Sequence, residues 1–143
     1  MIRLFPLLLV PVVIYNLIAL GGGVIMHMNI QDALSYQHAL AIPMFSGDVW
    51  KFSFGDFMIL LTLGLLFVEV VKATRTTSRE IINHGLSMLT FAGALVEFIT
   101  LKGFGTSPFF LITVMCLFDV VAGYTISIIA AKRDLSVAPP DQA

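Results

Sequence analysis

The sequence predicts an all-α integral membrane protein that folds as a four-transmembrane-helix bundle. Hydrophobic residues make up 58% of the 143 residues and charged residues only 12%, whereas a soluble domain has about 25% charged residues. The apolar residues also gather in four stretches. A membrane span needs about 20 residues to cross about 30 Å of hydrocarbon, and each stretch reaches this length with its flanks. The composition and the pattern therefore predict the same class.

A single domain is expected over residues 1–136. The predicted spans are residues 4–26, 55–74, 81–101 and 108–131, and residues 137–143 are expected to be a disordered cytoplasmic tail. Pro11 should kink the first span because proline lacks the amide hydrogen that a helix uses. Gly21–Gly23 should loosen or end that helix. Alternatively, residues 1–23 are a cleaved signal peptide, since a basic residue precedes the apolar run and Ala-Leu-Gly at 19–21 resembles a cleavage site.

Local signals mark where three of the predicted helices begin. Ser53 stands three residues before Asp56, and Thr77 stands three before Glu80. Both pairs match the capping box, in which each side chain bonds the backbone N–H of the other residue. Ser107 followed by Pro108 predicts an N-cap with proline at the first helical position.

The lysine and arginine residues predict the orientation. With both termini in the cytoplasm, six basic residues are cytoplasmic and two, Lys51 and Lys102, are on the opposite side. Such a bias follows the positive-inside rule. The cytoplasmic set is Arg3, Lys72, Arg75, Arg79, Lys132 and Arg133. In the longest external loop, residues 32–42 are predicted to form a short helix in the membrane interface.

Three carboxylates fall inside predicted spans: Glu69, Glu97 and Asp119. An ionisable residue in hydrocarbon costs about 2.5–3.5 kcal/mol, so it normally faces protein or water. Counting residues places Asp119 near the middle of the membrane, together with Tyr15 and Asn16. Glu97 is near the external end, and Glu69 lies near the cytoplasmic end at the depth of His84.

Helical spacing predicts that these polar groups face one another. Each of three helices carries one stripe of polar or small residues, so we expect the stripes to meet in a polar seam. The stripes are Asp119, Gly123, Ser127 and Ala131; Asn83, Thr90 and Glu97, with Gly93 beside them; and Gly55, Thr62 and Glu69. Gly123, Ser127 and Gly93 are therefore expected to let helices pack closely.

Each carboxylate has a structural and a functional interpretation. Glu69 would pair with Lys72 or accept a hydrogen bond from His84, and Glu97 would bond Thr100 or reach Lys102. No lysine or arginine shares the depth of Asp119, so its partner would be Asn16, Tyr15 or another carboxyl. We expect a lone buried Asp119 to be neutral, since an unpaired charge in hydrocarbon is costly. It either holds helices together or binds a proton or cation.

No residue pattern indicates catalysis or a cofactor. The three histidines are far apart in sequence, the single cysteine Cys116 lies in an apolar run, and no triad, nucleophile-elbow or H-E-x-x-H motif is present. No metal site, no cofactor and no catalytic residue are therefore predicted. The net charge of −1 argues against a nucleic-acid partner, which requires clustered basic residues.

In size and number of spans the chain resembles small bacterial four-span inner-membrane proteins, and the small membrane subunits of multi-component transporters. The resemblance includes no motif and implies no site residue. It favours a multi-pass protein of the cell inner membrane that serves as a non-enzymatic accessory or assembly subunit. Such a protein would have a membrane-protein partner or form a homo-oligomer in the lipid bilayer. The alternative is a small proton-coupled transporter or carrier that uses Asp119, Glu97, Glu69 and His84, and an enzyme is less expected.

Overall fold

The computed structural model describes residues 5–25, 30–35, 39–74 and 80–137. These residues form four long helices, a single short helical turn and a two-stranded hairpin. In chain order the elements are α1 Leu9–Ile25, α2 Ile30–Ala33, β1 Leu40–Pro43, β2 Val49–Phe52, α3 Phe54–Ala73, α4 Glu80–Thr100 and α5 Ser107–Val137.

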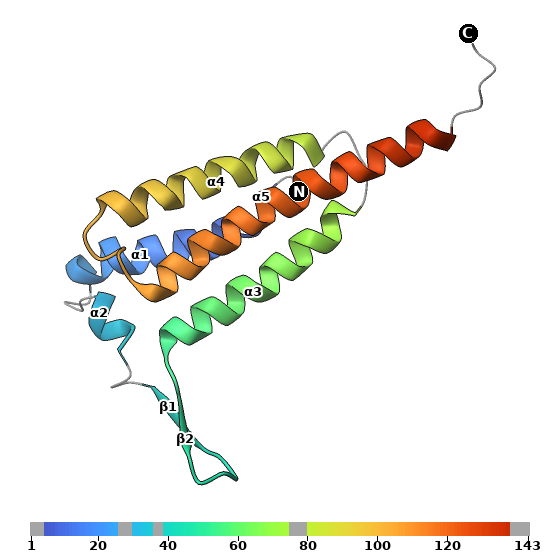
Figure 1. Cartoon of the computed structure of the whole chain (residues 1–143). Helices are drawn as coiled ribbons and strands as arrows, with labels where there is room; N and C mark the ends of the chain where they lie inside the picture. Colours follow the sequence, from blue (N-terminus) through green and yellow to red (C-terminus); the bar gives the residue numbers. More distant parts are fainter. Residues whose placement is uncertain (1–4, 26–29, 36–38, 75–79, 138–143) are drawn as a thin grey trace.

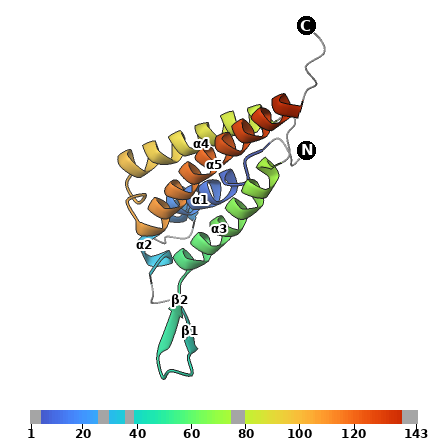
Figure 2. The same ribbon diagram turned by 45° about the vertical axis from the view of Figure 1, so that its right-hand side comes forward.

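The four long helices lie side by side and alternate in direction along the chain (Figures 1 and 2). α5 lies between α3 and α4 and packs against both of them. The bundle therefore has two ends, which we name by the connections that they hold. The α3–α4 end holds the end of α3 and the start of α4, and the α4–α5 end holds the turn between α4 and α5.

Three of these helices are long and apolar enough to cross a membrane. They are α3, α4 over Ile82–Thr100, and α5 over Ser107–Ala130. At 1.5 Å per residue, the 20 residues of α3 extend for about 30 Å, the thickness of a hydrocarbon core. α1 has 17 residues, which is about 25 Å, so it is the shortest of the four long helices.

A small apolar core occupies the middle of the bundle and the α4–α5 end. The aromatic ring of Tyr15 packs against Phe104 and Phe109, with ring centroids 5.4 and 4.5 Å away. Met58 and Ile112 are fully buried beside them. Many large apolar side chains point outward instead, among them Leu17, Leu63, Phe67, Leu89, Ile99 and Ile129. An apolar outer surface of this kind is expected where lipid replaces water.

The start of α1 differs from the prediction. The described chain makes a turn over residues 5–8, with Leu9 N bonded to Pro6 O at 3.1 Å, and the helix begins only at Leu9. Pro11 therefore occupies the first helical turn, where no amide hydrogen is required, so the predicted kink has no cause. The helix also continues through Gly21–Gly23 to Ile25. Of the two effects predicted for these glycines, loosening or ending the helix, the second is therefore wrong.

The predicted start of α3 is confirmed, and that of α5 is corrected. Ser53 caps α3, and the reciprocal capping box with Asp56 is formed. In α5 the hydroxyl of Thr106, rather than Ser107, accepts a bond from Phe109 N at 3.3 Å. Thr106 also supplies the first carbonyl of the helix, so Thr106 is the N-cap. The box predicted from Thr77 lies outside the described residues.

The segment between α1 and α3 contains a hairpin instead of the predicted interfacial helix at 32–42. Of the described residues between α1 and α3, only Ile30–Ala33 is helical, and β1 and β2 pair antiparallel with Leu40 opposite Phe52. The connecting turn has Gly47 at φ +91°, a conformation that favours glycine. The helix prediction failed because the strands are only four residues long. Short alternating patterns of this length predict local structure poorly.

The end of α5 also differs from the prediction. The helix extends to Val137, one residue into the predicted tail and past the predicted end of the last span at residue 131. α5 therefore reaches beyond the other helices at the α3–α4 end (Figure 1). Residues 138–143 lie outside the described residues.

Candidate functional site

Near the α3–α4 end, Glu69 of α3 joins α4 and the turn that precedes α1. Its side chain is 2% exposed. The Glu69 carboxylate accepts a hydrogen bond from Asn83 Nδ2 at 2.6 Å and one from Leu7 N at 3.3 Å. Lys72 Nζ donates to both carboxylate oxygens, at 3.1 and 3.0 Å. The predicted pair with Lys72 is thus present, while the amide of Asn83, rather than His84, supplies the bond from α4.

His84, the residue that follows Asn83 on α4, connects α4 to α5. Its Nε2 lies 2.8 Å from the hydroxyl oxygen of Ser127. The imidazole packs directly on Gly123, where an added Cβ would stand 2.5 Å from His84 Nδ1. Tyr124 covers the ring from the side, with centroids 5.5 Å apart. Gly123 and Ser127 therefore form a close helix contact, and its partner on α4 is His84.

Asp119 lies deeper in the same region and is 4% exposed. Ser87 of α4 lies beside it, and Glu69, His84 and Lys72 are all within electrostatic range. Cys116 of its own helix is also within this range. The carboxylates of Glu69 and Asp119 are thus brought to one place, as the spacing predicts. We call Glu69, Lys72, Asn83, His84, Ser87, Asp119 and Ser127 the polar cluster.

Two buried oxygen atoms of the polar cluster have no hydrogen-bond partner. They are Asn83 Oδ1 and Ser87 Oγ, and both side chains are 2% exposed. Ser87 is beside Asp119, but its hydroxyl does not reach hydrogen-bond geometry there. Leaving a buried polar atom unpaired costs about 1–3 kcal/mol. Native structures contain few such atoms, and each one calls for an explanation.

Glu97 belongs to a second polar group near the α4–α5 end. Its Oε2 accepts a bond of 2.8 Å from Asn16 Nδ2, which also donates to Val12 O at 3.1 Å. The predicted bond between Glu97 and Thr100 is not formed, because the Thr100 hydroxyl donates to Val96 O of its own helix. Asn16 is therefore a partner of Glu97, and not of Asp119.

Tyr15 also bonds away from Asp119. Its hydroxyl lies 2.6 Å from Thr106 Oγ1 and donates to Gly103 O at 3.0 Å. The count that placed Tyr15 beside Asp119 assumed a helix from residue 4, whereas residues 5–8 form a turn. Non-helical residues advance the chain by more than 1.5 Å each. The residues that follow the turn therefore lie closer to the α4–α5 end than the count predicts.

The two polar groups are separated along the bundle. Glu97 follows Asn83 by fourteen residues on α4, which corresponds to about 21 Å of helix. The threonines between them bond carbonyls of their own helices: Thr62 to Met58, Thr90 to Leu86 and Thr113 to Phe109. Apolar residues, including Ala94 and Ile112, fill the same region. The three carboxylates thus do not share one cavity in the described chain.

At Gly93 and Ser87 of α4, helical spacing alone did not identify which residues pack against the neighbouring helices. Gly93 is exposed, and an added Cβ would meet nothing within 4 Å. The prediction that Gly93 packs against a neighbouring helix is therefore wrong within this chain. The buried stripe of α4 instead runs through Asn83, Ser87, Thr90 and Ala94. Ser87 was missed, although it lies four residues after Asn83 and three before Thr90 on the same helical face.

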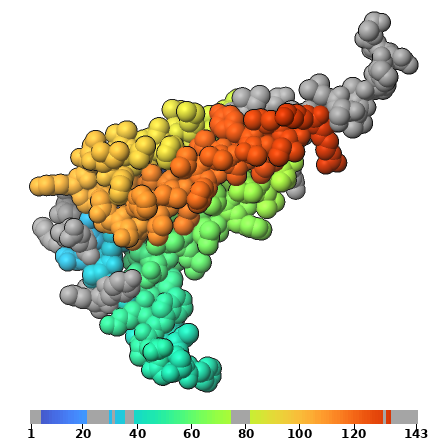
Figure 3. Space-filling model, viewed as in Figure 1, coloured from blue at the N-terminus to red at the C-terminus, as the bar shows by residue number. Residues whose placement is uncertain are grey.

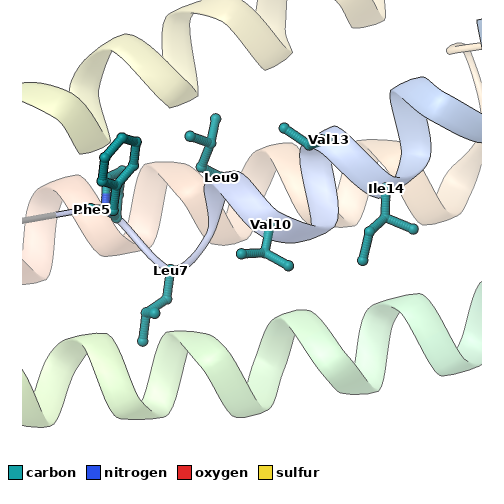
Figure 4. Close-up of a pocket in the computed structure, with 7 residues that line it drawn as sticks. Phe5, Leu7, Leu9, Val10, Val13 and Ile14 are labelled. Carbon is teal, nitrogen blue, oxygen red and sulfur yellow. The ribbon is translucent and has the colours of Figure 1, made fainter. Parts of the chain in front are cut away.

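A groove of about 500 Å³ lies along the first residues of α1, outside the polar cluster (Figure 4). It is lined by apolar side chains only: Phe5, Pro6, Leu7, Leu9, Val10, Val13 and Ile14. α3 and α4 run on either side of it in this view. Within the described residues, no three of the His, Cys, Asp and Glu side chains gather as a metal site would require.

Comparison with known proteins adds no assignment. No protein-family model, curated protein or solved structure matches this chain.

Proposed function

We propose that this chain is a four-span protein of the cell inner membrane, with both termini in the cytoplasm. The proposal is supported by three helices of spanning length and by the direction in which side chains face. Ionisable residues such as Glu69 and Asp119 face inward, and large apolar residues face outward. α1 would be the fourth span, because it lies within the bundle and its Asn16 bonds Glu97 of α4. In a membrane, helices that face lipid expose apolar side chains and turn ionisable ones inward, which is the opposite of the arrangement in a water-soluble protein.

Within that membrane, we propose that the protein serves as a non-enzymatic accessory or assembly subunit. The observation that carries this proposal is the hairpin of β1 and β2. It projects away from the bundle beside the start of α3 (Figures 1 and 3). Only Ser53 separates β2 from α3, so the hairpin would lie at the external surface of the membrane.

One face of the hairpin is apolar. Residues directly opposite one another in an antiparallel pair project to the same face, and the side alternates along each strand. The pairing of Leu40 with Phe52 and Ile42 with Trp50 therefore puts four apolar side chains together. Leu40 is 64% exposed and Trp50 is 51% exposed. The opposite face carries the one charged side chain of the two strands, Lys51, which is paired with Ala41, and also Val49, which is paired with Pro43.

A hairpin of this kind is suited to bind a partner. A two-stranded sheet alone is marginally stable in water, and its outer edges present unpaired backbone groups that accept another strand. Aromatic residues such as Trp50 are also frequent anchors at protein interfaces. The partner would be another membrane protein with an exposed apolar surface outside the membrane, or a second copy of this chain.

Site-specific photo-crosslinking in native membranes tests this proposal. A benzoylphenylalanine is placed at Trp50 on the apolar face or, as the matched control, at Lys51 on the opposite face. We expect a protein adduct from position 50 and little or none from position 51. The adduct mass distinguishes a second copy from a different protein. Adducts with lipid alone would show that the hairpin rests on the membrane surface, and the subunit proposal would then lose its support.

The carrier alternative has weaker support. A file of protonatable groups across the bilayer requires Glu97 to share a cavity with Asp119 and Glu69, whereas about 21 Å of α4 separates the two groups. The polar cluster is not a path between the two ends of the bundle.

A further inference from the structure

We propose that the partner of the hairpin is a second copy of this chain, and that β2 pairs antiparallel with β2 of that copy. The inference rests on the proposed function, because it names the partner of the same surface. Three observations carry it: which backbone groups of the hairpin point outward, where Pro43 lies, and which side chains the pairing brings together.

The turn of the hairpin determines which backbone groups point outward. Met44 N donates to Asp48 O at 2.9 Å, so these two residues bond each other across the hairpin. Hydrogen-bonded and non-hydrogen-bonded pairs alternate along antiparallel strands. The non-hydrogen-bonded pairs of the hairpin are therefore Pro43 with Val49 and Ala41 with Lys51. The backbone N–H and C=O groups of such pairs point away from the partner strand, toward the outer edges of the hairpin.

The two outer edges of the hairpin are not equivalent. On the edge of β1, Pro43 has no amide hydrogen to offer, and proline at such a position hinders the addition of a strand. On the edge of β2, Val49 and Lys51 each offer an N–H and a C=O, and both residues are exposed. No third strand joins this sheet within the described residues. The edge of β2 is therefore the one that can accept another strand.

The edge of β2 is complementary to itself in one antiparallel register. With Val49 opposite Lys51 of the second copy, Lys51 also lies opposite Val49 of that copy, and both pairs are hydrogen-bonded. A shift that places Lys51 opposite Lys51 would bring like charges together, which destabilises a strand pair. The reverse shift would place Lys51 opposite Gly47, which belongs to the turn. Only the first register pairs both outward-facing residues without a charge conflict.

This register also joins the apolar faces of the two hairpins. Trp50 lies opposite Trp50 of the second copy, in a non-hydrogen-bonded position where opposing side chains are closest. Its ring already packs on Phe52 of the same strand, with centroids 5.4 Å apart. Sheets of three or more strands with a hydrophobic face are stable, whereas an isolated hairpin is marginal. A photoreactive residue at position 50 would thus lie among apolar side chains of both copies, while one at position 51 would project past the short Val49 and away from the sheet.

The arrangement of the hairpin fits two copies in one membrane. The strands run across the axis of α3 rather than along it (Figure 1). A two-fold axis along the membrane normal reverses strands that lie along the membrane surface and leaves the direction of the helices unchanged. Antiparallel pairing is therefore compatible with equal orientation of both chains. The pairing uses the same edge of each copy, and the edges that remain carry Pro43, so the assembly closes at two copies.

Substitution by proline tests which edge is used. Lys51→Pro removes an outward N–H that the hairpin itself does not use, and Ala41→Pro is the same change on the edge of β1. Native mass spectrometry of the full-length protein in mild detergent measures the dimer. We expect dimers from the parent and from Ala41→Pro, and loss of the dimer from Lys51→Pro. Val49→Pro should have the effect of Lys51→Pro, because it removes the other outward N–H of β2.

Disulfide crosslinking in native membranes tests the register, in a Cys116→Ala background without other cysteines. Trp50→Cys should crosslink to a second copy of itself, because Cα atoms of opposite non-hydrogen-bonded residues are about 4.5 Å apart, within disulfide range. In a mixture of two differently tagged variants, Val49→Cys should join Lys51→Cys more than either joins itself. Ala41→Cys, on the edge of β1, is the control and should crosslink little.

The contrary results separate this inference from the proposed function. A monomeric parent protein that gives no crosslink at position 50 overturns the second copy as partner. A photo-adduct of position 50 with a different protein would then retain the subunit proposal, whereas adducts with lipid alone would overturn both. Equal loss of dimers in Ala41→Pro and Lys51→Pro would contradict pairing through β2. If the proline variants do not fold, absence of the Trp50→Cys crosslink overturns the inference by itself.

Discussion

Asn83 donates a hydrogen bond of 2.6 Å to Glu69 Oε1 and thereby joins α4 to α3 at a carboxylate that is buried from solvent. Hydrogen bonds to charged groups are worth about 1.5–3 kcal/mol. This one also holds the Glu69 side chain in the position where Lys72 reaches both of its oxygens. The bond is therefore a main contact between the two helices at the α3–α4 end.

Asn83→Ala should lower the free energy of unfolding by about 1–3 kcal/mol, because Glu69 loses a donor that water cannot readily replace. The unfolding midpoint in a denaturing-detergent titration measures this loss. Thr125→Ala serves as the control, since its exposed hydroxyl bonds only Val121 O of its own helix. Equal midpoints for the two variants would contradict the importance of the bond to Glu69.

Gly123→Leu should destabilise the bundle by about 1–3 kcal/mol, because even a Cβ at this position would collide with the imidazole of His84. Gly93→Leu is the same substitution at a position with nothing within 4 Å, and it should have little effect. Val121→Leu, on the exposed face of α5, should be mild as well. Thermal melting in detergent compares the three. Similar losses at Gly123 and Gly93 would argue against a directed contact between α4 and α5.

Tyr15→Phe removes one hydroxyl that contacts both Gly103 O and Thr106 Oγ1 at the α4–α5 turn. A loss of about 1–2 kcal/mol is expected, since each neutral hydrogen bond contributes about 0.5–1.5 kcal/mol. Tyr124→Phe is the matched control, because Tyr124 is 43% exposed. The same melting experiment applies. A Tyr15→Phe variant as stable as Tyr124→Phe would mean that α1 is held to this turn by apolar packing alone.

The orientation is tested with a reporter that is active only outside the cytoplasm. Fused after Ala143 it should stay inactive, and inserted in the turn between β1 and β2 it should be active. The physical reason is the excess of basic residues on the cytoplasmic side, six against two. Activity at the C-terminus and none in the turn would reverse the proposed topology.

Several parts of this structure were predictable because they depend on neighbouring residues. The capping box of Ser53 and Asp56 joins atoms three residues apart. The inward direction of Thr62 and Glu69 follows from their spacing of seven residues on α3. Helix length follows from the length of each apolar stretch. These features require no information about which helix lies next to which.

The hairpin and the start of α1 were not predictable in this way. Strands of four residues give too short an alternation to be told from loop, although Ser46, Gly47 and Asp48 are typical turn residues. The turn over residues 5–8 breaks the simple count of depth along the first apolar stretch. As a result, Tyr15 and Asn16 of α1 lie closer to the α4–α5 end than that count predicts.

The sequence alone therefore determined the apolar composition, the approximate limits of three long helices and the face of each helix that carries its polar residues. Only the tertiary structure decided which polar residues meet. Glu69 bonds Leu7 and Asn83, His84 bonds Ser127, and Asn16 bonds Glu97 across 81 residues of sequence. Such pairs depend on the rotation of each helix and on its position along the bundle axis. Packing of whole helices sets both quantities, whereas the periodicity of one segment sets neither.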